Sequence, residues 1–79
     1  MSGRLCVKIA GIEVCERDVV EVHVGRRAVR GRVDGFQFLD GSDFRVPVFI
    51  IVVDSHGRRT SVRIQKISAI TVYGQKEDS

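Results

Sequence analysis

A run of eight apolar residues, 46–53, stands out in the hydrophobic pattern of the chain. It is mostly β-branched, contains Phe49, and is too short to span a membrane as a helix. Such a run predicts a strand that is buried on both faces. Pro47 is expected near the start of this strand, because proline cannot donate a hydrogen bond to a neighbouring strand. The flanking segments alternate between apolar and polar residues, which predicts half-buried strands wrapped around a central one.

Alternation of apolar and polar residues predicts the other strands of the fold. The predicted strands cover residues 5–9, 12–14, 19–24, 28–38, 58–64 and 67–73. Short turns are expected at 10–11, 25–27 and 54–57, a longer loop at 39–45, and a short break such as a single 3₁₀ turn at 65–66. Most of these connections are short enough for hairpins between antiparallel strands.

The longest alternating segment, 28–38, contains two glycines. Its valines are expected to point inward, whereas Arg30 and Arg32 point outward. Gly31 and Gly35 lie where a strand of a small barrel has to bend sharply. One long strand broken by glycines could therefore serve both halves of a folded-over sheet.

Composition supports an all-β class. Leucine occurs only at Leu5 and Leu39, whereas valine and isoleucine dominate the apolar residues, and this bias favours strands over helices. A chain of 79 residues allows one domain. We expect residues 1–74 to form a small, strongly bent, five- to six-stranded antiparallel barrel with an N-terminal β-hairpin. Residues 75–79 are polar and are expected to form a disordered tail.

The two cysteines, Cys6 and Cys15, are too few for a secreted disulfide scaffold and lack the paired short spacing of zinc sites. A Cys2His2 site with His23 and His56 is disfavoured, because the spacing matches no zinc pattern. A disulfide across the first hairpin is a further alternative. The favoured expectation is that both cysteines are small buried apolar side chains.

The charge is mildly basic, with a formal net charge of +3 and an isoelectric point near 9.3, which suggests an anionic partner. Most cations are arginines, whose planar guanidinium suits phosphate groups and base stacking. They form two groups along the chain: Arg26, Arg27, Arg30 and Arg32 in the first, and Arg58, Arg59, Arg63 and Lys66 in the second. If the two groups share one face, ~4 to 6 phosphate contacts are possible, with a steep salt dependence.

Two features bear on whether these arginines bind nucleic acid. The alternative to nucleic-acid binding is that the arginines form a solvated face and pair with Glu13, Glu21 and Asp34 on neighbouring strands. Aromatic side chains that could stack on bases are few, and Phe44 and Tyr73 are the best candidates for exposed positions. The remaining rings are expected in the core: Phe36, Phe38 and Phe49.

Two segments resemble the motifs of the Sm-like family. Residues 25–37, GRRAVRGRVDGFQ, resemble the first Sm motif, in which a turn glycine precedes a hydrophobic-x-Gly-x-hydrophobic-x-Gly-Phe-Asp run. Residues 62–70, VRIQKISAI, resemble the second, and the Ile67-Ser68 pair matches the bacterial RNA chaperone Hfq. The C-terminal half also resembles the Rho inhibitor Rof. The resemblance covers residues 19–73.

This resemblance implies a strongly bent five-stranded sheet that binds single-stranded RNA and often forms rings through its edge strands. The implied base-binding positions lie near Gln37 and near residues 63–66. Arg63 keeps the arginine of the second motif, but Ile64 and Gln65 replace the glycine and asparagine that follow it. The Lys-His pair of the Hfq version and the asparagine expected after the first motif are also replaced.

The predicted function is binding of nucleic acid, with single-stranded RNA favoured over DNA. The residues predicted to make the contacts are Arg26, Arg27, Arg30, Arg32, Gln37, Arg58, Arg59, Arg63 and Lys66. The alternative is an SH3-like module for protein interaction or homo-oligomerisation through edge strands. No nucleophile elbow, phosphate-cradling loop or metal motif occurs, so we expect no enzyme, cofactor, metal or membrane partner. Without a recognisable signal or transit peptide, the expected location is cytoplasmic.

Overall fold

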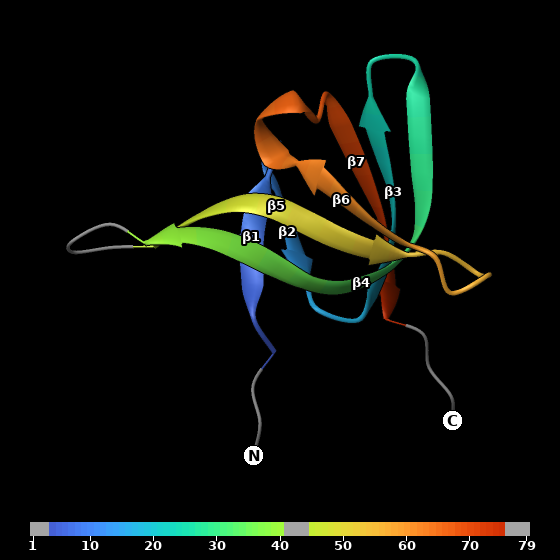
Figure 1. The fold of residues 1–79 in the computed structure, drawn as a ribbon, viewed down its shortest axis with the longest axis horizontal. Helices are drawn as coiled ribbons and strands as arrows, with labels where there is room; N and C mark the ends of the chain where they lie inside the picture. Colours follow the sequence, from blue (N-terminus) through green and yellow to red (C-terminus); the bar gives the residue numbers. More distant parts are fainter. Residues whose placement is uncertain (1–3, 41–44, 76–79) are drawn as a thin grey trace.

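The computed structural model describes residues 4–40 and 45–75, which form seven strands and one short 3₁₀ helix (Figure 1). The elements are β1 (Cys6–Ile9), β2 (Ile12–Cys15), β3 (Asp18–Val24), β4 (Arg27–Asp40), β5 (Arg45–Val53), β6 (Arg59–Arg63), η1 (Ile64–Lys66) and β7 (Ala69–Gln75). The predicted all-β class is confirmed. The predicted loop 39–45 is too long, because β4 continues to Asp40 and β5 begins at Arg45. β7 likewise includes Gly74 and Gln75, and the rest of the predicted tail lies outside the described residues.

The strands form two antiparallel sheets. β1 and β2 pair as a separate hairpin, and the other five strands form one sheet in the order β6-β5-β4-β3-β7. β6 and β7 are therefore the two edges of the larger sheet. Within the described residues no strand pairing joins these edges, and the sheet is not closed by its hydrogen bonds.

Strand β4 holds the larger sheet together. Its first part, Arg27 to Arg32, pairs with β3, and its second part, Arg32 to Asp40, pairs with β5. One strand of 14 residues thus serves both halves of the sheet, as the sequence predicts. Its pairing register shifts between Val33 and Gly35, so Asp34 is an extra residue in a β-bulge.

Gly31 marks the point where β4 passes closest to the end of β5. A Cβ atom at this position would overlap the carbonyl oxygen of Val53 and lie 2.9 Å from a methyl group of Val52. Only glycine leaves room for the two strands to pack here. The close approach of β5 is a reason for glycine at this position in addition to the bend that the sequence predicts.

Strand β5 differs from its prediction, because only one of its faces is buried. Ile50 and Val52 are fully buried, while Phe49, Ile51 and Val53 on the opposite face are half-exposed. The strand lies between β4 and the edge strand β6, and its outer face is left partly open to solvent. Although the sequence of this strand is continuously apolar, its side chains alternate between a buried face and a partly exposed face.

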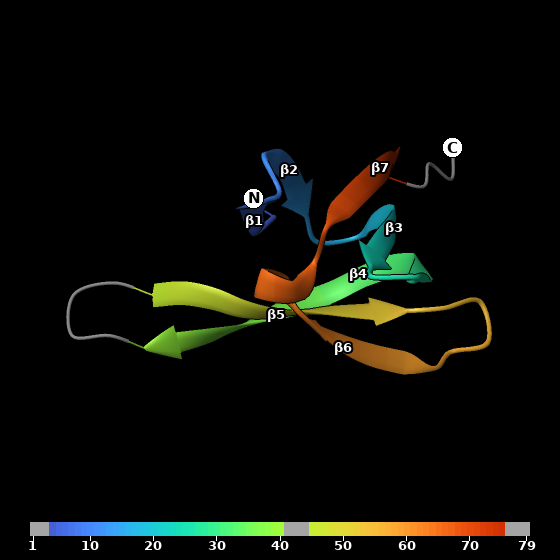
Figure 2. The ribbon, with the colours of Figure 1, turned by 90° about the horizontal axis from the view of Figure 1, so that it is seen from above.

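The core lies between the sheet and the β1–β2 hairpin. Ile9 and Val14 of the hairpin are almost completely buried and join Val20, Val22 and Val33 in the core cluster. Figure 2 shows the hairpin on the same side of the β4–β5–β6 layer as β7. The hairpin therefore covers apolar side chains that the sheet alone would leave exposed.

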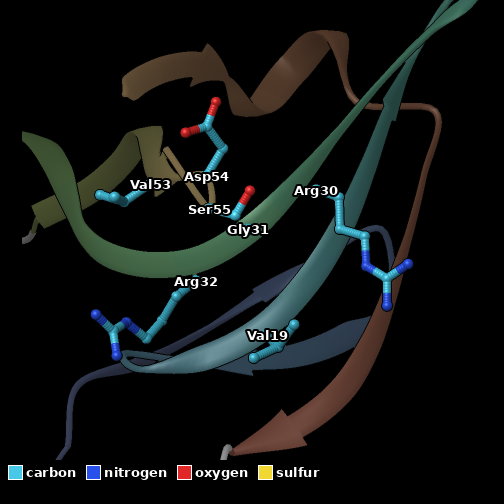
Figure 3. A pocket seen from close by; sticks show the side chains of 7 residues that line it. All are labelled: Val19, Arg30, Gly31, Arg32, Val53, Asp54 and Ser55. Atoms are coloured by element: carbon cyan, nitrogen blue, oxygen red, sulfur yellow. The ribbon is translucent and has the colours of Figure 1, made fainter. Parts of the chain in front are cut away.

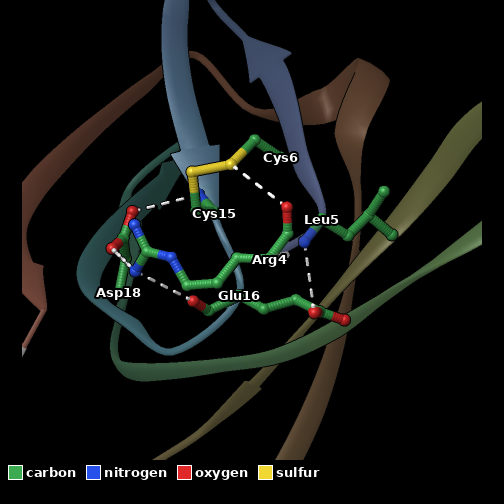
Figure 4. The surroundings of a disulfide bond; sticks show 6 residues. All are labelled: Arg4, Leu5, Cys6, Cys15, Glu16 and Asp18. Carbon is green, nitrogen blue, oxygen red and sulfur yellow. Dashed lines mark hydrogen bonds and ion pairs between the residues drawn. A yellow bond between two sulfur atoms is a disulfide. The ribbon is translucent and has the colours of Figure 1, made fainter. Parts of the chain in front are cut away.

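The prediction for the cysteines is wrong, since Cys6 and Cys15 form a disulfide (Figure 4). The two residues are directly opposite each other in the register of the β1–β2 hairpin. Asp18 supports the same end of the hairpin, because its carboxylate accepts a hydrogen bond from the Cys15 backbone N–H at 3.0 Å and pairs with Arg4 at 3.4 Å. The register, which the sequence does not specify uniquely, brings the sulfur atoms together.

Candidate nucleic-acid interface

A row of three side chains crosses the outward face of the sheet. Gln37 of β4 is directly opposite Phe49 of β5, and Phe49 is directly opposite Arg63 of β6. The guanidinium carbon of Arg63 lies 5.7 Å from the centroid of the Phe49 ring. An amide, an aromatic ring and a guanidinium thus lie next to one another, although Arg63 follows Gln37 by 26 positions in the sequence.

This row corrects the prediction for Phe49, which was assigned to the core. The residue lies on the same face as Ile51 and Val53 and is half-exposed. The bulge at Asp34 also matters, because it changes which residues of β4 point outward after this position. As a result Gln37 points outward, while Phe36 packs against the core and contacts the ring of Phe38 edge-on at 6.5 Å between centroids.

A groove of about 650 Å³ lies farther along the same face, around Arg30 and Arg32 of β4 (Figure 3). Val19 of β3 and Val53 of β5 form its apolar sides. The two arginine side chains extend in different directions on the two sides of Val19. Val53 follows Phe49 by four residues, about 13 Å along a strand. The groove and the Gln37–Phe49–Arg63 row therefore belong to one surface, which we call the outer face.

Arg30 forms a second pair with an aromatic ring. Its guanidinium carbon lies 4.7 Å from the ring centroid of Tyr73 on β7, and the Tyr73 hydroxyl donates a hydrogen bond to Glu21 at 3.1 Å. Tyr73 is 50% exposed, which agrees with the prediction of an exposed ring. Phe44, the other predicted stacking candidate, lies outside the described residues.

Arg58 and Arg59 lie at the hairpin between β5 and β6, and of these two only Arg59 forms an ion pair with another described residue. Its guanidinium is 3.0 Å from the carboxylate of Asp34, so the predicted cross-strand pairing applies to this arginine. In the hairpin turn, Asp54 accepts backbone hydrogen bonds from His56 and Arg58, each at 2.9 Å. The bond from Arg58, more than that from His56, holds the pKa of Asp54 below its usual value.

The remaining predicted residues lie away from the groove. Arg26 is exposed in the turn between β3 and β4, where Gly25 adopts a positive φ of 60°. Arg27 and Lys66 border a small pocket between this hairpin and η1, and Arg63 also borders it. The structure therefore divides the nine predicted residues between the outer face, two turns and this pocket, and does not join them in one cluster.

Within residues 4–40 and 45–75, neither histidine belongs to a group that could hold a metal. His23 lies 3.7 Å from Glu21, and His56 is exposed in its turn. Among the described residues, the one group with suitable ligand atoms comprises Cys6, Glu13 and Cys15, and its two sulfur atoms are bonded to each other. The arrangement is a structural crosslink.

Comparison with known proteins finds no matching family model, no similar curated protein and no similar solved structure. Within the part of the chain that the structure describes, no helix is long and apolar enough to cross a membrane.

Proposed function

We propose that this chain binds single-stranded nucleic acid on its outer face, with RNA favoured over DNA. The observation that carries the proposal is the row of Gln37, Phe49 and Arg63 across three adjacent strands. A base can stack on the half-exposed Phe49 ring or on the guanidinium plane of Arg63, and the amide of Gln37 can form hydrogen bonds with a base edge. These are the three kinds of contact by which proteins hold unpaired bases.

The groove supplies contacts to the backbone of the same strand. Arg30 and Arg32 are exposed, and neither has an ion-pair partner among the described residues. Their guanidinium groups can therefore bind phosphates, while Asp54 at the groove uses its carboxylate for the turn hydrogen bonds. The outer face would thus contact the bases of one part of an extended single strand at the Gln37–Phe49–Arg63 row. It would contact the phosphates of another part of the same strand at Arg30 and Arg32.

We further propose that the fold is a small barrel of the Sm-like or SH3-like type. The five-stranded antiparallel sheet, the long β4 that serves both of its halves, and the close packing at Gly31 support this assignment. The contacts of Ile67 and Ser68, the pair that resembles the Hfq motif, also support this assignment. Ile67 is buried, and both the backbone N–H and the hydroxyl of Ser68 donate to the carbonyl oxygen of His23.

Fluorescence anisotropy tests the proposed function. Labelled single-stranded RNA, single-stranded DNA and duplex DNA of matched sequence are each titrated at low and at near-physiological salt. The proposal predicts micromolar or tighter binding that prefers single-stranded RNA and weakens as salt increases. Affinity for the duplex equal to that for the single strands would contradict a site built on unpaired bases.

A second candidate is a module for protein interaction or homo-oligomerisation. Leu39 and Val46 face each other at the end of the β4–β5 hairpin and are 66% and 41% exposed, and β6 and β7 are sheet edges. An extended segment of a partner could pair with such an edge and cover these side chains. Flat titrations for all three nucleic acids, together with a concentration-dependent increase in molecular mass, would favour this candidate.

A further inference from the structure

A small pocket of about 210 Å³ lies at one end of the sheet, between the β3–β4 hairpin and the β6–η1 segment. Val24 and Val29 of the hairpin and Val62 of β6 line it with apolar side chains. Val62 is buried in the core, and Val24 and Val29 pack against the core, so the inner side of the pocket is apolar. Arg27 of the hairpin, Arg63 at the end of β6 and Lys66 of η1 also line it.

The position of Lys66 is fixed by the residues that follow it. Ile67 is buried, and its backbone N–H closes the single turn of η1 by donating to the carbonyl oxygen of Ile64 at 3.1 Å. Ser68 donates two hydrogen bonds to His23 near the end of β3, at 2.9 Å from its backbone N–H and 3.1 Å from its hydroxyl. These contacts hold η1 close to the β3–β4 hairpin, which carries Arg27.

The cations around this pocket have no acidic partner in the part of the chain that the structure describes. Among the described residues, no carboxylate forms an ion pair with Arg27, Arg63 or Lys66. Arg59 and Arg4 differ in this respect, because each pairs with an aspartate. The contact of Arg63 with the Phe49 ring leaves its positive charge in place. An anion that enters the pocket therefore meets cations that have no ion-pair partner among the described residues, together with the apolar side chains of Val24, Val29 and Val62.

We infer that this pocket binds a terminal phosphomonoester of the nucleic-acid strand, which rests on the proposed function of the outer face. A phosphomonoester carries a charge of about −1.5 to −2 at neutral pH, more than an internal phosphodiester, and it suits a site with several cations. The pocket, at about 210 Å³, is below the roughly 300 Å³ of typical small-molecule sites, a size that suits a single phosphate group.

Arg63 connects the two sites. It stacks beside Phe49 in the row on the outer face and also borders the pocket. A strand that lies along the outer face can therefore pass Arg63 and place its end between Arg27 and Lys66. The same strand would have its bases on the outer face and its terminal phosphate in the pocket.

The test compares RNA strands that differ only at one end. A 3′-labelled strand is prepared with a 5′-phosphate or a 5′-hydroxyl, and a 5′-labelled strand with a 3′-phosphate or a 3′-hydroxyl. At one of the two ends, the phosphorylated strand should bind about tenfold more tightly, the effect expected of additional charge-assisted hydrogen bonds. Lys66→Ala and Arg27→Ala should each reduce this ratio toward one.

Two variants serve as controls. Lys8→Ala removes the same charge from an exposed position of β1 that does not line the pocket, and should leave the ratio unchanged. The double variant Arg30→Ala with Arg32→Ala should weaken binding of phosphorylated and hydroxyl strands by the same factor. Unchanged thermal midpoints show that the substitutions at these exposed positions leave the fold intact.

Equal affinities of phosphorylated and hydroxyl strands at both ends would overturn the inference and leave the proposed function standing. Absence of binding by any strand would overturn both. Adenosine 5′-monophosphate is added as a competitor in a further series. If it abolishes the difference at concentrations comparable to those of the strand, the pocket takes free nucleotides, and the assignment to a strand end is wrong.

Discussion

The guanidinium carbon of Arg63 lies 5.7 Å from the ring centroid of Phe49, on the outward side of two neighbouring strands. This contact holds a cation and an aromatic ring together beside Gln37. Such a pair can receive an unpaired base, because the ring offers stacking and the cation offers charge to the adjacent phosphate. The outer face thus combines properties that neither arginines alone nor an apolar strand alone would supply.

Replacing Phe49 by leucine should weaken binding of single-stranded RNA. Leucine keeps an apolar side chain at this half-exposed position but removes the ring, and loss of one base stacked on an aromatic ring costs about 1–3 kcal/mol. Anisotropy with the same labelled RNA measures the effect. Phe36→Leu is the matched control, because this ring packs against the core and its loss should alter stability with little change in affinity. Equal affinities for wild type and Phe49→Leu would remove Phe49 from the site.

Two adjacent isoleucines of β5 should respond differently to truncation. Ile50 is fully buried, so Ile50→Ala should lower the free energy of unfolding by about 2–5 kcal/mol. Ile51 is half-exposed, and Ile51→Ala should cost less, about 1–2 kcal/mol. Urea denaturation of the two variants measures the difference. Similar losses would mean that β5 is buried on both faces after all.

The disulfide between Cys6 and Cys15 should stabilise the fold measurably. It closes a loop with a sequence separation of nine, for which chain entropy predicts about 2–3 kcal/mol. Urea denaturation with and without a dithiol reductant should show this loss. The double variant Cys6→Ala with Cys15→Ala should be insensitive to the reductant. An identical midpoint of the wild-type protein under both conditions would show that the crosslink contributes nothing.

Asp54 should give the fold a stability that depends on pH. Backbone hydrogen bonds from Arg58 and His56 hold its pKa below the usual value, so the folded state favours the ionised carboxylate. This contribution is present above the pKa of the unfolded chain, near 4, and is lost as the pH falls through the lower folded pKa. Urea denaturation at several pH values should therefore show that the advantage of wild type over Asp54→Asn shrinks below about pH 4. A constant difference over this range would contradict the account.

The alternation along the chain predicts the class and most strands, and the glycines at Gly31 and Gly35 predict the dual role of β4. Burial of β5 is mispredicted, because an apolar run has no polar residues to show which face is open. The disulfide depends on the β1–β2 register, which places Cys6 opposite Cys15. Strand register is a property of the pairing between two strands, and the sequence of one strand carries little information about it.

The same reasoning applies to the candidate site. Alternation correctly places Arg30 and Arg32 on the exposed side of β4. The row that joins Gln37 to Arg63 is not visible in the sequence, because it depends on the bulge at Asp34 and on two successive strand registers. A bulge reverses the direction of every following side chain, so a simple alternation from Arg30 would point Gln37 inward.

The salt dependence of RNA binding tests the central claim most directly. The logarithm of the binding constant for single-stranded RNA is measured against the logarithm of salt concentration for wild type and for Arg30→Ala with Arg32→Ala. Each lost phosphate contact lowers the slope by about 0.7 for single strands, so the double variant should bind more weakly with a slope smaller by about 1.4. Identical slopes and affinities for the two proteins would show that nucleic acid does not contact the outer face through these arginines.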